Sequence, residues 1–156
     1  MARRRRAEPR IIAPDPRFNS VLLARFINKV MIGGEKSVAQ TAVYGALERL
    51  ERETNRPGLE VFEQAVRNVT PALEVRSRRV GGATYQVPTE VRPERRLSMA
   101  LRWLIGSARA RTGRPIAQRV YEELLDASRG QGASVRRRED LHRMAEANRA
   151  FVHYRW

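Results

Sequence analysis

The sequence contains no cysteine and only two histidines. Without thiols it can form neither a disulfide framework nor a thiolate metal site, which excludes a zinc finger and is compatible with a reducing compartment. No apolar run reaches the ~18 residues that span a bilayer. Charges and prolines interrupt residues 7–17, where a signal peptide would need an apolar stretch. We therefore expect a cytoplasmic protein with no membrane partner.

Motifs for catalysis are also missing. His142 and His153 lack a serine and acid arrangement, and no Gly-x-Ser-x-Gly elbow occurs. His142 and Glu146 have metal-ligand spacing on a predicted helix, but no third ligand lies nearby. Gly81 and Gly82 precede a strand rather than a helix, which indicates a turn and not a phosphate-binding loop. The sequence predicts no cofactor, no metal and no enzyme activity.

Positive charge is what the sequence has in excess. It has 31 Lys and Arg residues and 17 Asp and Glu residues, which gives a formal net charge of +14. Lys29 and Lys36 are the only lysines, so 29 of the 31 cations are arginines. Because the planar guanidinium binds phosphate in a bidentate manner and stacks on bases, this bias favours a nucleic-acid partner.

The charge is clustered along the chain. Net charges of +4, +3, +5 and +3 belong to residues 1–17, 74–96, 97–121 and 136–156, whereas residues 122–135 carry −2. Charges that form a docking surface are clustered in this way, whereas charges that only keep a protein in solution would be spread evenly. We interpret the acids of the negative segment as an exposed helix face without catalytic function: Glu122, Glu123 and Asp126.

Apolar residues at the helical period predict six helices. The stripes occupy residues 22–31, 38–50, 59–69, 93–108, 115–125 and 135–148. Gly33-Gly34, Asn55 and Pro71 are expected to end the first three helices, and Pro93 and Pro115 to begin the fourth and fifth. In the sixth helix we expect three residues to face inward: Leu141, Met144 and Ala145.

Residues 74–92 instead predict a β-hairpin that turns at Gly81-Gly82. Alternation places Arg76 and Arg78 on one face and Arg79 on the other, so at least one charged face must meet solvent or a partner. RNA contact is the favoured interpretation. The alternative is an exposed edge strand that uses charge against aggregation.

The predicted fold is mainly α: a single domain of six helices with a protruding two-stranded β-hairpin arm and a basic N-terminal extension. Residues 1–17 are expected to form an extended arm, 18–148 the helical domain with the hairpin at about 74–92, and 149–156 a C-terminal tail. In this tail, Phe151 and Trp156 either stack on bases or pack on the core. Trp103 is expected mainly to pack on the core.

Several strings of the sequence resemble bacterial small-subunit ribosomal protein seven. The most specific is Glu74-Val-Arg-Ser-Arg-Arg-Val-Gly-Gly-Ala-Thr-Tyr-Gln-Val-Pro88. Others are Phe26-Ile-Asn-Lys-Val-Met31, Val43-Tyr-Gly-Ala46, Val61-Phe-Glu-Gln-Ala65, Glu90-Val-Arg-Pro93, Leu101-Arg-Trp-Leu104, Met144-Ala-Glu-Ala-Asn148 and His153-Tyr-Arg-Trp156. The resemblance covers essentially the whole chain. One departure is Glu35, which follows Gly34 where the family usually has lysine.

The resemblance implies a structural constituent of the ribosome that binds small-subunit rRNA in the 3′ major domain and nucleates assembly of the head. It also implies a place at the subunit interface near the decoding centre and exit-site tRNA, with small-subunit ribosomal proteins nine and eleven as neighbours. The hairpin tip would lie near the tRNA, which concerns five residues: Val80, Gly81, Gly82, Ala83 and Thr84.

The basic clusters supply the candidate rRNA-binding residues. They are Arg3, Arg4, Arg5, Arg6, Arg10, Arg76, Arg78, Arg79, Arg92, Arg95, Arg96, Arg102, Arg109, Arg111, Arg114, Arg136, Arg137 and Arg138. Two other classes compete with this interpretation. A DNA-binding protein would need the polar recognition face of a helix-turn-helix, and an rRNA-modifying enzyme would need a cofactor loop; neither feature is found.

Overall fold

The computed structural model describes residue 8 and residues 10–154. Within that part there are six α-helices, one 3-10 helix and a two-stranded antiparallel sheet. The elements are α1 (Val21–Val30), α2 (Lys36–Thr54), α3 (Gly58–Val69), β1 (Leu73–Val80), β2 (Ala83–Glu90), α4 (Pro93–Ala110), α5 (Ile116–Ser128), α6 (Ala133–Ala147) and η1 (Arg149–Tyr154). The predicted fold class is confirmed. The short helix η1 was not expected.

Local signals set the ends of the helices. The Ser20 hydroxyl accepts a hydrogen bond from the Leu23 N–H at 3.3 Å and caps α1. Asn55 adopts a left-handed conformation (φ 51°) that ends α2, and Pro93 is the first residue of α4. The sequence predicts helix boundaries at two of these residues, Asn55 and Pro93.

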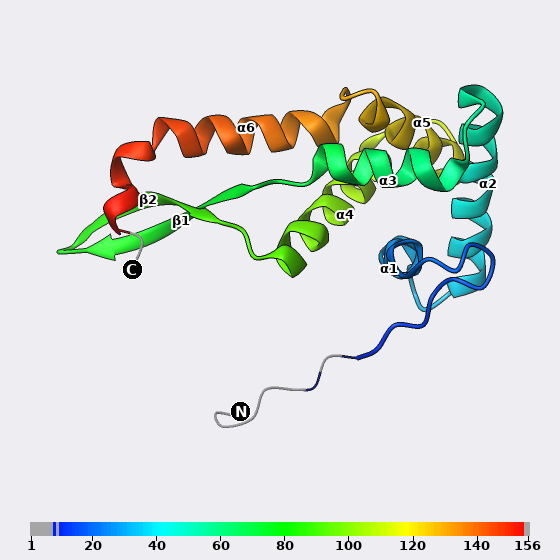
Figure 1. Ribbon diagram of the computed structural model, residues 1–156, viewed down its shortest axis with the longest axis horizontal. Helices are drawn as coiled ribbons and strands as arrows, with labels where there is room; N and C mark the ends of the chain where they lie inside the picture. The colour runs from blue at the N-terminus through cyan, green and yellow to red at the C-terminus, as the bar shows by residue number, and fades with distance from the viewer. Residues whose placement is uncertain (1–7, 9, 155–156) are drawn as a thin grey trace.

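Helices α1 to α5 gather at one end of the molecule and enclose the core (Figure 1). Phe26 of α1 meets Phe62 of α3 with ring centroids 5.1 Å apart. Fully buried leucines from the other helices surround this pair: Leu47, Leu50, Leu101, Leu104 and Leu124. The core therefore joins five helices and gives the adjoining hairpin a rigid support.

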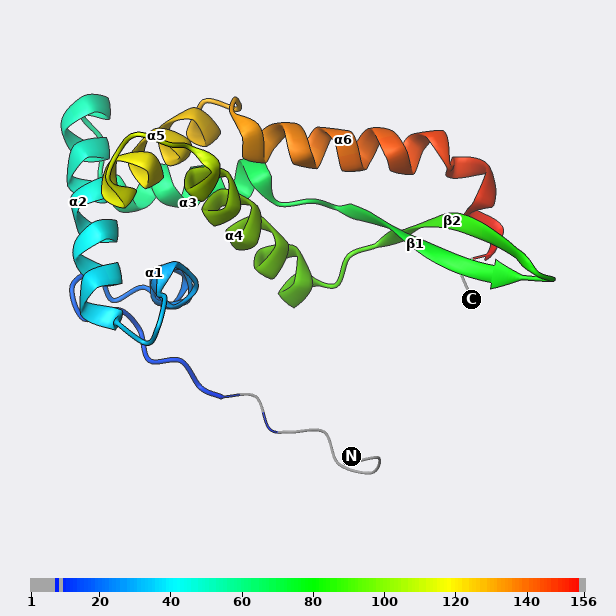
Figure 2. The ribbon, with the colours of Figure 1, turned by 180° about the vertical axis from the view of Figure 1, so that it is seen from behind.

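Helix α6 leaves this bundle and runs beside the hairpin (Figures 1 and 2). Ala145 is buried as expected, and Val135 is buried as well. The prediction for Met144 was wrong, because this side chain is 51% exposed, and Leu141 is only half-buried. The helical period identifies a face, but along most of α6 that face covers a thin hairpin rather than the core.

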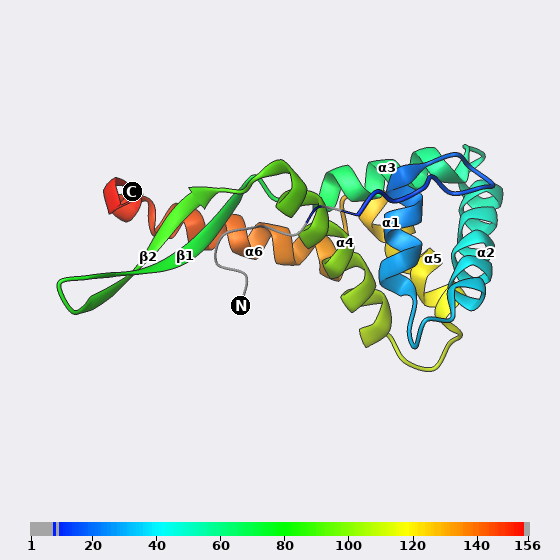
Figure 3. The same cartoon turned by 90° about the horizontal axis from the view of Figure 1, so that it is seen from below.

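The hairpin pairs from Leu73 opposite Glu90 to Val80 opposite Ala83. Gly81 and Gly82 form the turn with φ of +56° and +90°, conformations that favour glycine. Val87 is fully buried at the base, whereas the turn is exposed. Seen from below, the tip projects beyond η1 (Figure 3). The predicted hairpin is thus a protruding arm with an anchored base.

The C-terminal segment holds the outer part of this arm. Tyr85 of β2 stacks on Tyr154 at 5.0 Å and lies against Phe151 at 5.3 Å. Phe151 therefore packs on the hairpin and not on the core of the helical domain. Trp156 lies outside the described residues.

The base of the arm is attached to α6 through His142. Its Nε2 accepts a hydrogen bond from the Ala72 N–H at 3.2 Å, and the Ala72 carbonyl accepts one from the Val91 N–H at 3.1 Å. Burial lowers the pKa of the His142 imidazole, and the Arg138 charge lowers it further. The neutral ring is thereby favoured, as an acceptor at Nε2 requires.

The N-terminal segment is attached to the domain at Asp15. This side chain is 3% exposed, and its carboxylate accepts hydrogen bonds from the Tyr44 hydroxyl at 2.7 Å and the Phe18 N–H at 3.1 Å. Arg17 extends the attachment by binding Glu48 at 2.8 Å. No regular helix or strand occurs in the described residues before Asp15.

We expect Gly58→Ala to destabilise the protein by about 1–3 kcal/mol, the usual range for overpacking. A Cβ at Gly58 would lie 2.5 Å from the Leu47 carbonyl oxygen, so α2 and α3 would have to move apart. Gly45→Ala is the matched control within α2. No atom lies within 4 Å of a Cβ there, so this substitution should stabilise the protein by about 0.5–1 kcal/mol through the higher helix propensity of alanine. Urea unfolding measures the change in the free energy of unfolding for both variants. Equal changes would contradict the close contact between Gly58 and the Leu47 carbonyl group.

The free energy of unfolding should fall as the pH is lowered below about 6.5, where the unfolded imidazole takes up a proton. Because the pKa of His142 is lower in the folded state, the folded protein takes up this proton only at a lower pH. The loss of stability therefore ends once the pH falls below the pKa of the folded state. His142→Gln should flatten this dependence between pH 7.5 and 5.5 in urea unfolding, whereas His153→Gln should preserve it. If the free energy of unfolding of His142→Gln varied with pH as steeply as that of the parent, the proposed contact of His142 with Ala72 would be refuted.

Candidate nucleic-acid interface

Three arginines form a row along one face of α4. Arg95, Arg102 and Arg109 are seven residues apart, a spacing that returns to nearly the same side of a helix. All three are exposed, while the opposite side of α4 is buried through residues such as Leu101 and Leu104. At 1.5 Å per residue the row extends over about 21 Å. A phosphate backbone lying along α4 could contact every member.

Helix α6 adds a further cation to this row. An arginine nitrogen, Nη1 of Arg137, lies 3.5 Å from the position of a Cβ on Gly106 of α4. Gly106 is four residues after Arg102 and three before Arg109, so it neighbours both on the helix surface. The structure thus brings together Arg102, Arg109 and Arg137, although α4 and α6 are separate basic segments of the sequence.

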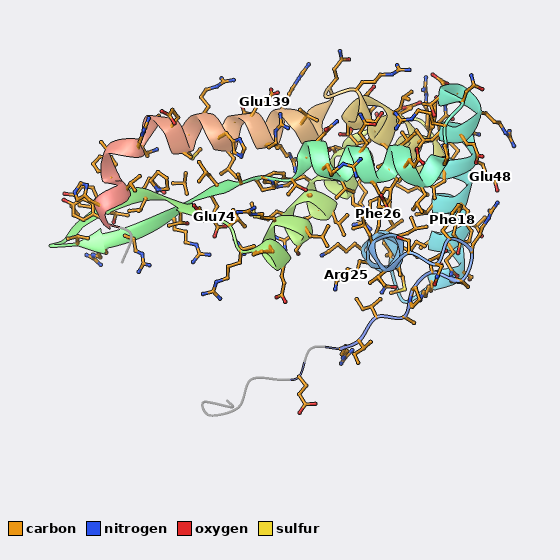
Figure 4. All side chains as sticks on the ribbon, viewed as in Figure 1. Phe18, Arg25, Phe26, Glu48, Glu74 and Glu139 are labelled. Carbon is orange, nitrogen blue, oxygen red and sulfur yellow. The ribbon has the colours of Figure 1, made fainter. Side chains whose placement is uncertain are left out.

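Glu74 joins the row to the base of the hairpin. Its side chain, labelled in Figure 4, is 5% exposed. Its two oxygens accept hydrogen bonds at 2.6 Å from Nε of Arg76 and at 2.6 Å from Nε of Arg95. Burial alone raises the pKa of this carboxyl, but the bonds from Arg95 and Arg76 outweigh it, and the pKa lies below its usual value. Glu74 is therefore charged at neutral pH.

The remaining hairpin arginines differ in their contacts. Arg78 and Arg79 are exposed on strand β1, opposite Tyr85 and Thr84. Arg92 is exposed immediately before α4, whereas Nε of Arg96 donates to the Val91 carbonyl oxygen at 2.7 Å. Cations thus lie along β1, in the linker before α4 and in the first turn of α4. The tip, residues 80–84, carries no charge itself, although Arg79 adjoins it and pairs with Thr84.

The acids of α5 are not the exposed face that the sequence predicted. Glu123 is 1% exposed and binds Nη2 of Arg111 at 2.8 Å, while Asp126 binds the same nitrogen at 2.5 Å. Glu123 also accepts hydrogen bonds from the Ser134 N–H and hydroxyl at the start of α6. The prediction failed because the segment after α4 turns back over α5 and carries Arg111 onto its acidic side.

This cluster neutralises two of the candidate rRNA-binding residues. Burial lowers the pKa of Arg111, but the bonds from Asp126 and Glu123 outweigh it and raise the pKa. Arg114 pairs with Glu122. Arg109 is less constrained: it is exposed and uses one nitrogen, Nη2, to donate to the Val30 carbonyl oxygen at 3.1 Å.

The other candidates lie on α6 and in the N-terminal segment. Arg136 is exposed, whereas Arg138 is half-buried and donates to the Asn68 carbonyl oxygen at 2.5 Å. Arg10 is exposed. Arg3, Arg4, Arg5 and Arg6 lie outside the described residues.

Sequence reasoning missed the role of Glu74. It counted this residue only as one acid in a basic segment, yet the carboxylate holds two of the candidate arginines. A local signal exists, because Glu74 and Arg76 are two apart on a strand and must lie on the same face. Nothing local indicates Arg95, which is 21 positions from Glu74.

The described residues contain no cluster of three or more His, Asp or Glu side chains able to hold a metal ion. Glu146, the partner suggested by spacing for His142, instead pairs with Arg149 at 3.3 Å. Among these residues there is also no helix with the length and apolar character needed to cross a membrane.

Comparison with known proteins gives consistent matches over the whole length. Residues 2–149 match the family described as ribosomal protein S7p/S5e. Small ribosomal subunit protein uS7 of Rhizorhabdus wittichii is 60% identical over 156 residues, and that of Dehalococcoides mccartyi 57% over 156 residues, with 100% of both chains covered in each case. The corresponding protein of Fervidobacterium nodosum is 53% identical over 154 residues, covering 99% of both chains.

Proposed function

Because this chain belongs to the ribosomal protein S7p/S5e family, we propose that it binds small-subunit rRNA directly through the arginine row of α4 and the base of the hairpin. Family membership makes it a structural, non-enzymatic constituent of the small ribosomal subunit that takes part in translation. The observation that carries the proposal is the alignment of Arg95, Arg102 and Arg109 on one exposed face.

The contacts divide the candidate arginines into two groups. Those whose charge faces outward supply most of the phosphate binding: Arg76, Arg78, Arg79, Arg92, Arg95, Arg102, Arg109, Arg136 and Arg137. Those that are half-buried, or paired with an acid of α5, contribute less and mainly hold elements together: Arg96, Arg111, Arg114 and Arg138. Arg10 and the preceding Arg3 to Arg6 add a separate basic arm.

The finer assignment follows from the resemblance. The rRNA site lies in the 3′ major domain, where binding nucleates assembly of the head. The protein lies at the subunit interface near the decoding centre, beside small-subunit ribosomal proteins nine and eleven, and the uncharged tip at residues 80–84 approaches exit-site tRNA. The geometry supports this division, because Arg92, Arg95 and Arg96 lie beside the base of the hairpin, whereas the uncharged turn is at the other end of its strands.

We expect binding to a transcript of the 3′ major domain to weaken steeply with salt. Each phosphate neutralised by arginine releases roughly 0.7–0.9 counterions, depending on the form of the strand. Arg102→Gln should reduce the log-log slope by about one. Arg52→Gln on α2, distant in sequence from the row and also exposed, is the matched control and should leave the slope unchanged. A slope near zero for the parent would refute arginine–phosphate binding.

The tip and base of the hairpin should be separable by mutation. Removing residues 80–84 and closing the strands with an Asn-Gly turn should leave rRNA binding and subunit assembly intact, because this segment carries no charge. It should alter retention of exit-site tRNA or maintenance of the reading frame. Replacing Arg76 and Arg78 by Ala should instead impair rRNA binding. Filter binding and a frameshift reporter distinguish the two, and loss of rRNA binding on tip removal would contradict this division.

A further inference from the structure

One buried carboxylate lies within the surface assigned to RNA. Glu74 is 5% exposed, while Arg76 and Arg95, its two partners, are 49% and 54% exposed. Among the residues that the structure describes, no other side chain binds either guanidinium. The arginines come from β1 and from the first turn of α4, so a single carboxylate sets the relation between a strand and a helix.

We propose that Glu74 is a positioning residue for rRNA recognition, which holds Arg76 and Arg95 side by side with their outer edges directed at the RNA. This inference rests on the proposed rRNA-binding function. Each arginine donates its Nε to Glu74. The fork geometry of a guanidinium leaves further N–H donors on the opposite edge, where a phosphate can bind.

The electrostatics make the proposal specific. A carboxylate beside a phosphate-binding surface repels RNA, so considered as a charge alone Glu74 weakens binding. Considered as a positioning group it strengthens binding, because two flexible side chains are ordered before RNA arrives and less side-chain entropy is lost. The two effects have opposite signs, and the sign can be measured.

The experiment compares Glu74→Gln with Glu94→Gln, using the full chain and the 3′ major domain transcript. Both variants remove one negative charge, and Glu94 is exposed in the same first turn of α4. Gln at position 74 retains one oxygen acceptor in place of two, so at least one arginine is released. We expect Glu74→Gln to bind about tenfold more weakly and Glu94→Gln to bind as tightly as the parent or more tightly. Unchanged or tighter binding by Glu74→Gln overturns the proposal, as does an equal loss in Glu94→Gln.

A double-mutant cycle separates positioning from a general structural effect. When Arg76 and Arg95 are both replaced by Gln, adding Glu74→Gln should cause no further loss of affinity. A tenfold further loss would show that Glu74 acts through the fold and would overturn the inference. The proposed function is tested independently by the double arginine variant itself, because parent-like binding there would remove these residues from the interface.

If Glu74→Gln does not fold, replacement of Arg76 and Arg95 by Lys tests the same point with Glu74 in place. The ammonium keeps the charge but lacks the fork that binds a carboxylate and a phosphate on different edges. The matched control replaces Arg78 and Arg79 by Lys, since neither contacts Glu74. We expect about tenfold weaker binding for the first pair and a smaller loss for the control. Equal affinities for the two pairs overturn the proposal.

Discussion

The structure depends on how its few buried carboxylates pair with cations and backbone N–H groups. A carboxylate taken out of water is stable only when its oxygens are bonded, so each one fixes the elements that carry its partners. Glu74 joins β1 to α4, and Glu123 joins the segment after α4 to the start of α6. With 17 acids for 31 cations, these pairs also decide which arginines remain unneutralised.

The unneutralised arginines explain why the protein is complementary to RNA. A net charge of +14 repels itself, and this repulsion opposes the compact state in the free chain. Phosphates placed along the α4 row would supply the missing negative charge. They would approach exposed guanidinium groups that already lie on a rigid helix, so binding requires little movement of the backbone. The helical core and the basic surface therefore serve different ends: the core sets positions, and the partner supplies the balancing charge.

Local signals accounted for the order and ends of the elements, because caps and turns act over a few residues. Ser20, Asn55 and Gly81-Gly82 each determine the conformation of their own neighbourhood. Pairings between distant residues gave no such signal. The burial of Glu123 depends on Arg111, 12 positions away, and the role of Glu74 on Arg95, 21 positions away. Segment charges thus located the basic surfaces, but which arginines are neutralised within them follows only from tertiary packing.

The same packing makes the hairpin a rigid extension of the RNA-binding body. Glu74 connects the hairpin to α4, and His142 of α6 binds the backbone of Ala72 just before the hairpin. Nearer the tip, Tyr85 packs on the aromatic side chains of η1. Three attachments at different distances along a two-stranded arm resist bending and rotation together. The uncharged tip begins beyond the last of them. Its position is consequently set by the elements that carry the proposed rRNA-binding surface, so docking of the arginine row on rRNA would fix where the tip lies without a contact of its own.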